Sequence, residues 1–212
     1  ILNKDKENKF YKNDFQNFMN IRSNNEIKWD DPKTHAISSK PEYKRRKKFL
    51  EINKLRNKCI LEIGSSSGFM LMPLKKNNNK LYGVEPSIEF RNYTSNIGIT
   101  TFQEINNLSK RFYNYFDLII HYYVLEHIEN PISFLKNLLK FIKPGGKMIF
   151  EVPNVNDPLI TIFKTKEFDN FYWSVAHHWY FSPFTLGNLL KKNKFKFYFY
   201  FDQRYDISNH LT

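Results

Sequence analysis

The sequence predicts an α/β protein built on a doubly wound, mostly parallel sheet. From residue 58 onward, short apolar runs alternate with amphipathic segments. These runs are apolar on both faces, as expected of strands that helices cover on both sides. The run 58–63 also leads into a loop of small residues, 64–68, before a second apolar segment. This order is typical of a buried strand that turns tightly into a helix.

Composition limits the function classes. The 212 residues suffice for one domain with a substantial core, and the net charge of +12 favours an anionic partner. Such a partner could be a phosphorylated small molecule, a nucleic acid or an anionic membrane surface. Cys59 is the single cysteine, which excludes a disulfide framework and makes a reducing cytoplasm the expected location. No apolar run is long enough to span a membrane.

Residues 1–57 are expected to form an N-terminal helical cap or lid, ahead of a sheet domain at 58–212. Phe15, Phe18 and Met19 have helical spacing, and Pro41 can begin a further helix. That helix has a basic run at 44–48, which is either a solvated face or a surface that binds phosphates.

The sheet domain is expected to contain six or seven strands. The expected strands are at 58–63, 81–84, 99–102, 116–121, 147–152 and 195–201, with a short seventh near 205–211 if the chain does not continue. The expected helices are at 69–75, 88–95, 132–142 and 185–192. The aromatic stretch 154–181 interrupts this alternation. Because long connections are often functional, we expect it to be a binding insertion.

The loop 64–68 narrows the class of nucleotide. A dinucleotide site requires Gly-x-Gly-x-x-Gly, but Ser66 and Phe69 occupy the second and third glycine positions. A phosphate-binding P-loop is excluded because no Gly-Lys-Ser/Thr follows. Gly64 and Gly68 still allow positive φ and a close approach to a ligand.

Four stretches resemble, in the same order, motifs of the class I S-adenosylmethionine-dependent methyltransferases, a family that includes the ubiquinone-biosynthesis methyltransferases. The stretches are 61–68, 84–87, 116–128 and 139–146. The resemblance covers residues 58 to 200 and implies a Rossmann-like, seven-stranded methyltransferase sheet. It implies S-adenosyl-L-methionine as cofactor and S-adenosyl-L-homocysteine as product. Ser66 departs from the family's glycine, so we expect a less permissive backbone there.

The resemblance also implies the cofactor-binding positions. Glu85 would accept hydrogen bonds from both ribose hydroxyls, although it could instead be a solvated acid that caps the next helix. Glu62 would organise the loop. The remaining positions are Gly64, Ser66 and Gly68 under the methionine part, Pro86 (or Ile88) beside the adenine, Glu104 and Ile105 at the adenine edge, and His121 near the methionine end.

Three histidines are candidate general bases for a hydroxyl acceptor: His127, His177 and His178. His127 follows Glu126, and a similar Glu-His pair helps to hold a divalent metal in the ubiquinone-biosynthesis enzymes. Their additional acid corresponds to Tyr123 here, so no metal site is expected. The alternative role of His127 is packing or capping, and that of His177 and His178 is to anchor the lid. His35 could join the site from the cap.

The sequence therefore predicts a small-molecule methyltransferase that prefers an oxygen atom. An anionic acceptor is expected, such as a phosphorylated or nucleotide-linked sugar, and analogy points to bacterial surface (capsule) polysaccharide biosynthesis. One alternative, an RNA methyltransferase, is disfavoured because no Asn/Asp-Pro-Pro-Tyr/Phe motif follows a strand. Another is a non-catalytic cofactor-binding scaffold. An exposed sheet edge would favour a homodimer.

Overall fold

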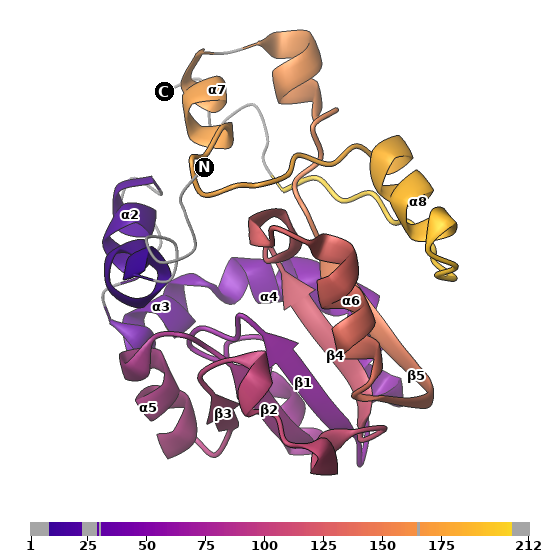
Figure 1. Ribbon diagram of the computed structural model, residues 1–212. Coiled ribbons are helices and arrows are strands. Elements are labelled where there is room, and N and C mark those ends of the chain that lie inside the picture. The colour runs from indigo at the N-terminus through magenta and orange to yellow at the C-terminus, as the bar shows by residue number, and fades with distance from the viewer. Residues whose placement is uncertain (1–8, 23–28, 30, 165, 205–212) are drawn as a thin grey trace.

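A five-stranded parallel sheet forms the centre of the molecule, with strand order β3-β2-β1-β4-β5 (Figure 1). The computed structural model describes residues 9–22, 29, 31–164 and 166–204. The strands are β1 (Cys59–Ile63), β2 (Lys80–Val84), β3 (Thr100–Phe102), β4 (Phe116–Tyr122) and β5 (Ile142–Glu151). All four pairings are parallel, which confirms the predicted sheet and its first five strands.

Both faces of the sheet are covered, as predicted. On one face Leu61 and Ile119 pack against Leu138 of α6 (Pro131–Leu139). On the other face Ile60 and Ile120 pack against short helical turns that contribute the side chains Leu50, Met70, Leu71 and Leu74. Because side chains alternate along β1, they contribute to two separate hydrophobic cores, one on each face of the sheet.

The helix predicted at 69–75 begins three residues later and is a 3-10 helix. The chain makes two turns after the loop and then a 3-10 helix, Met72–Asn77. Most of the hydrogen bonds here span three residues, since the amide of Leu71 donates to Gly68 O and that of Leu74 to Leu71 O, although the amide of Met72 also donates to Gly68 O. Pro73 has no N–H to donate, which removes one bond that an α-helix would need.

The other predicted helices exist with small shifts in their bounds. They are α5 (Ile88–Asn96), α6 and α8 (Pro183–Lys192). Helix α6 ends at Leu139, three residues before the predicted end, because Ile142 already belongs to β5 and pairs with Phe116. Helix α8 begins at Ser182, whose hydroxyl accepts from the amide of Thr185.

The sixth strand predicted at 195–201 is wrong, because no strand pairing includes this segment. Its aromatic side chains alternate, but Phe197 and Phe199 pack against α8 at Gly187, whereas Tyr198 is 89% exposed. Gly187 lets the two rings approach, since a Cβ there would lie 3.2 Å from Phe199. The predicted seventh strand lies outside the described residues.

The described residues of the segment predicted to form a cap include three α-helices: α2 (Phe15–Arg22), α3 (Pro32–Ser38) and α4 (Lys40–Arg46). The Asp31 carboxylate accepts from the amide of Thr34 and so starts α3. Helix α2 confirms the helical spacing of Phe15, Phe18 and Met19. The basic run at 44–48 is not a solvated face throughout, because Arg45 and Arg46 turn inward.

The aromatic insertion contains a π-helical turn, Leu159–Phe163, and α7 (Lys166–Tyr172). A bridge between Asn154 and Phe181 brings its two ends together. In Figure 1 the insertion and α8 lie above the carboxyl ends of β1 and β4. Within the described residues, no helix has both the length and the apolar character that crossing a membrane requires.

Candidate active site

The loop after β1 wraps around the carboxylate of Glu85. Backbone φ is positive at Gly64 (70°), Ser66 (39°) and Gly68 (70°). The amide of Ser66 donates to Oε2 of Glu85 at 2.9 Å, and that of Ser87 donates to Oε1 at 2.8 Å. Ser66 thus takes the conformation expected only of glycine. That conformation costs about 1–2 kcal/mol for an L-residue, and the bond to a charged acceptor offsets much of this cost.

Glu85 keeps the capacity to bind hydroxyl groups. It ends up at the carboxyl end of β2, directly after Val84, and it lines the groove that the loop borders. Burial raises the pKa of Glu85 to about 6, and the amides of Ser87 and Ser66 oppose that rise. Each carboxylate oxygen accepts from one backbone amide and has a second lone pair, so the two oxygens can accept from two adjacent hydroxyls.

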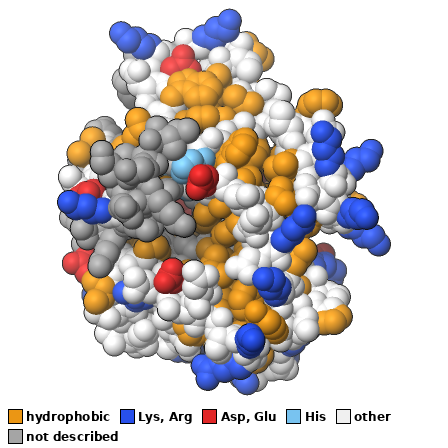
Figure 2. Space-filling view, in the orientation of Figure 1, with side chains coloured by type: hydrophobic (Ala, Val, Ile, Leu, Met, Phe, Trp, Pro, Cys, Tyr) orange, Lys and Arg blue, Asp and Glu red, His pale blue; other side chains and the backbone are white. Residues whose placement is uncertain are grey.

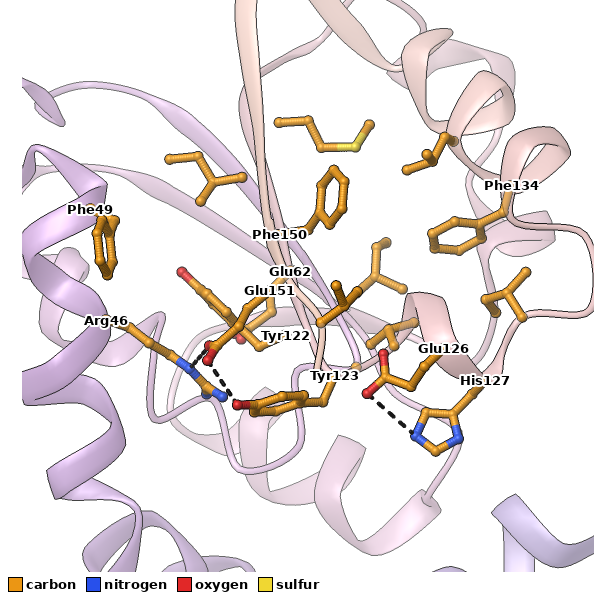
Figure 3. Close-up of a pocket in the computed structure, with 18 of the residues that line it drawn as sticks. Arg46, Phe49, Glu62, Tyr122, Tyr123, Glu126, His127, Phe134, Phe150 and Glu151 are labelled. Atoms are coloured by element: carbon orange, nitrogen blue, oxygen red, sulfur yellow. Dashed lines mark hydrogen bonds and ion pairs between the residues drawn. The ribbon is translucent and has the colours of Figure 1, made fainter. Parts of the chain in front are cut away.

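Glu62 and Arg46 lie together at the end of β1, on the wall of the same groove (Figure 3). Glu62 is 2% exposed, and its Oε2 has no hydrogen-bond partner among the described residues. Burial holds the pKa of Glu62 well above its usual range, although the nearby Arg46 guanidinium lowers it. Oε2 of Glu62 can therefore accept a hydrogen bond from the ammonium of an amino acid.

Arg46 was missed at the level of sequence because it lies within a basic run. Glu151, the last residue of β5, accepts from Arg46 Nε at 2.8 Å, from an Arg45 guanidinium nitrogen at 2.7 Å and from the Tyr123 hydroxyl at 2.8 Å. The Arg46 guanidinium also lies 4.3 Å from the centre of the Tyr122 ring. These arginines are therefore held by carboxylates of the protein itself, and the phosphate-binding interpretation of the run is not supported at them.

The predicted adenine side is assembled in part. Pro86, Glu104 and Ile105 line the groove together with the loop, whereas Ile88 is 63% exposed and does not. Figure 2 shows the hollow on this face, bordered by hydrophobic side chains. The groove is open and large, about 2590 Å³, and extends from the loop to the segment after α8.

His121 lies away from the groove. It is fully buried under α6, where its ring stacks on Phe150 at 4.8 Å and meets Phe134 edge-on at 5.5 Å. Burial lowers the pKa of His121 to about 3. The predicted contact with the cofactor's methionine end is not supported by this position, because β4 directs the side chain at residue 121 into the other layer.

His35 is also buried and serves the cap. Its Nδ1 lies 2.8 Å from the Ser67 hydroxyl, and its ring lies 4.3 Å from the Trp29 ring. Burial lowers the pKa of His35 to about 4, so the imidazole is neutral near pH 7. The side chain anchors the cap to the loop and does not join the other histidines.

Two of the three predicted catalytic histidines come together at the end of β4. His127 lies on the turn Leu125–His127, and His177 comes from the insertion with its ring 4.7 Å from the His127 ring. Glu126 joins them, with Oε1 4.0 Å from His127 Nε2 (Figure 3). His178 is not among the side chains that line the groove, and its amide donates to Glu126 O at 2.8 Å.

This cluster has the composition of an open metal site, which the sequence did not predict. One ligand atom each from Glu126, His127 and His177 lies within 4.8 Å of the others. A carboxylate with two imidazoles suits divalent first-row metals and leaves positions for a substrate. Tyr123, on which the expectation of no metal rested, points to Glu151 instead, and His177 supplies the third group.

Comparison with known proteins agrees with this geometry. A family model described as a methyltransferase domain matches residues 36–198. The ubiquinone biosynthesis O-methyltransferase of Coxiella burnetii is 31% identical over 109 residues, which are 48% of this chain and 46% of that protein. A tRNA U34 carboxymethyltransferase of Campylobacter jejuni is 28% identical over 121 residues, 50% of this chain and 39% of that protein. The chain thus matches less than half the length of either relative.

The fold is also shared with solved methyltransferases. The plantazolicin methyltransferase BpumL, solved in complex with SAH, superposes with a TM-score of 0.55 at 21% identity, over 78% of this chain and 71% of that one. The family match covers more than half of the chain. The chain therefore belongs to the methyltransferase domain family.

Proposed function

We propose that the protein methylates a hydroxyl oxygen of a small acceptor, with His127 and His177 at the acceptor end of the groove. The observation that supports this most is the cluster of Glu126, His127 and His177 on the wall of the groove that also holds Glu85. A hydroxyl nucleophile needs a base to take its proton, and an imidazole suits that role near neutral pH.

Each part of the groove has a task in this proposal. S-adenosylmethionine, when bound, supplies a methyl group on a positively charged sulfur. Glu85 accepts the ribose hydroxyls, and Glu62, whose Oε2 has no partner among the described residues, accepts from the ammonium of the amino-acid end. The insertion covers the acceptor and excludes water, so that the hydroxyl approaches in line. An imidazole of the cluster would accept the hydroxyl proton as the C–O bond forms and the methyl–sulfur bond breaks, with S-adenosylhomocysteine as the leaving group.

A metal is a second way in which the same cluster could activate the acceptor. Glu126, His127 and His177 would hold the ion, which would favour the alkoxide form of a bound hydroxyl. Removal of metals with a chelator, followed by addition of Mg²⁺ or Zn²⁺, separates the two routes. If activity survives the chelator, an imidazole and not a metal ion activates the acceptor hydroxyl.

The acceptor is tested directly with labelled cofactor and fractionated metabolites, followed by mass spectrometry for a gain of one methyl group. We expect His127→Gln and His177→Gln to lower turnover by about 100-fold or more, the usual effect of losing a general base. His178→Gln is the matched control and should retain turnover within about threefold, since its side chain does not line the groove. Equal losses in all three variants would contradict the assignment.

An anionic acceptor and a surface-polysaccharide pathway stay predictions. The net charge of +12 supports the former, whereas Arg45 and Arg46 do not, because carboxylates already hold them. RNA is the second candidate acceptor, favoured by the charge and by the tRNA-modifying relative. Methylation of total RNA that disappears at moderate salt would support it. Cofactor binding without transfer to any fraction would instead indicate a non-catalytic scaffold.

A further inference from the structure

The hydrogen-bond partners of His127 fix which ring nitrogen has the proton. Nδ1 of His127 lies 2.9 Å from the backbone oxygen of Ala176. A carbonyl oxygen can only accept, so this contact is a hydrogen bond only when Nδ1 is protonated, and the Tyr11 hydroxyl can then accept from the same N–H. In neutral His127 the lone pair is then on Nε2, the nitrogen that faces Glu126.

Tyr11, from the N-terminal cap, makes the second contact with the same nitrogen. Its hydroxyl oxygen lies 2.7 Å from His127 Nδ1 and can donate to Ala176 O at 3.5 Å. The Tyr11 ring meets the His127 ring edge-on, at 5.7 Å and 85°. The Tyr11 hydroxyl can therefore accept a hydrogen bond from a protonated Nδ1, and this contact restricts rotation of the imidazole. The two residues are 116 positions apart in the sequence.

Tyr11 is also part of the cofactor half of the groove. With Phe15 and Trp29, it lines a small recess beside Ser66 and Glu85. Aromatic contacts continue from Tyr11 to Phe15 at 5.3 Å and from Phe15 to Trp29 at 5.6 Å. A cofactor ribose held at Glu85 would thus lie beside the residue that contacts His127.

We propose that Tyr11 is a positioning residue that holds His127 in the Nδ1-protonated tautomer, with Nε2 directed at the acceptor, and that bound cofactor secures this contact. The inference rests on the proposed function for the identity of the acceptor end, but the tautomer is a property of the protein alone. It applies equally if Nε2 takes a proton or binds a metal.

The test uses the full chain with histidine labelled with ¹⁵N in the ring. Two-bond ¹⁵N–¹H spectra report the tautomer, and His127→Gln assigns the signal. The wild type should show a single His127 tautomer with Nδ1 protonated, and S-adenosylhomocysteine should shift that signal. In Tyr11→Phe we expect a mixture of tautomers and no response to S-adenosylhomocysteine. Tyr113→Phe, a half-exposed tyrosine outside the groove, should behave as wild type.

Turnover provides the second readout. Losing one hydrogen bond of ordinary strength should lower kcat about 3- to 10-fold, while KM for the cofactor changes less than about threefold. An Nε2-protonated His127 in the wild type, or an unchanged tautomer and kcat in Tyr11→Phe, would overturn the proposal. If no acceptor is methylated but the tautomer is fixed and depends on Tyr11, the proposed function fails and the assignment of Tyr11 stands.

Discussion

Replacement of Glu85 by alanine should remove most of the affinity for S-adenosylhomocysteine. Two changes coincide in this variant. The ribose hydroxyls lose a charged acceptor, and the Ser66 amide loses the oxygen 2.9 Å away that holds the loop in its positive-φ conformation. A hydrogen bond to a charged group contributes about 1.5–3 kcal/mol, so two ribose bonds amount to about 3–6 kcal/mol. A rise in Kd of at least about 100-fold follows.

The pKa of Glu85 adds a pH dependence with a definite sign. Because burial raises that pKa to about 6, the carboxylate loses its charge as the pH falls through 6, and with it the acceptor for ribose. If only the ionised form binds, Kd at pH 5 should be about tenfold weaker than at pH 8. The Glu85→Gln variant retains one acceptor oxygen, so its affinity should lie between those of the wild type and the alanine variant and should vary little with pH.

Isothermal titration calorimetry with S-adenosylhomocysteine at pH 5, 6 and 8 measures both effects. The matched control is Glu89→Ala, which removes an exposed acid in the first turn of α5 and should leave Kd unchanged. The ribose assignment would be refuted by a Kd for Glu85→Ala within about threefold of the wild type. A wild-type affinity that is flat between pH 8 and pH 5 would contradict the ionisation argument alone.

Three further predictions concern stability. Glu151→Gln should lower the free energy of unfolding by about 2–3 kcal/mol in urea, because it removes the carboxylate shared by the buried Arg46 and the half-buried Arg45, although both still contact Glu42 and Arg45 also contacts Asp202. The exposed Glu51→Gln should cause no measurable change; equal effects would contradict the network. His35 and His121 are neutral in the fold, with pKa values lowered to about 4 and about 3, and take up protons on unfolding below about pH 6.5. Stability should therefore fall by up to about 2.7 kcal/mol per pH unit as the pH drops from 6 to 4, and His35→Gln should halve this slope in acid unfolding followed by circular dichroism. If His35→Gln leaves the slope of stability against pH unchanged, protonation of His35 does not cause the loss of stability. Ser66→Gly should raise the free energy of unfolding by about 1 kcal/mol, since glycine adopts positive φ without strain; a loss of stability would show that the serine side chain is needed.

Sequence patterns correctly predicted those elements whose structure depends on residues close together in the sequence. The run at 58–63, the small-residue loop and the acid at Glu85 lie within 28 residues of one another. Since parallel strands end at one edge of a sheet, their order was enough to place Glu85 beside the loop. The N-cap at Ser182 likewise depends only on its own first turn.

Predictions failed where a segment's partner lies elsewhere in the chain. The alternation at 195–201 shows which aromatic side chains share a face, but it does not distinguish a neighbouring strand from α8 and its Gly187. The basic run at 44–48 looked solvated because the carboxylate of Glu151 is about a hundred residues away. The periodicity of apolar residues or a run of charged residues indicates which side chains share a face. It does not indicate which part of the protein packs against that face.

The sequence by itself determined the family, the parallel sheet and the cofactor loop, because these depend on short motifs and their order. Only the tertiary structure brought together the residues of the proposed acceptor end. His127 and His177 are 50 residues apart, Tyr11 is farther still, and no spacing predicts that they meet. Their meeting depends on how the cap and the insertion pack over the strand ends, and that packing is set by long-range burial and side-chain direction.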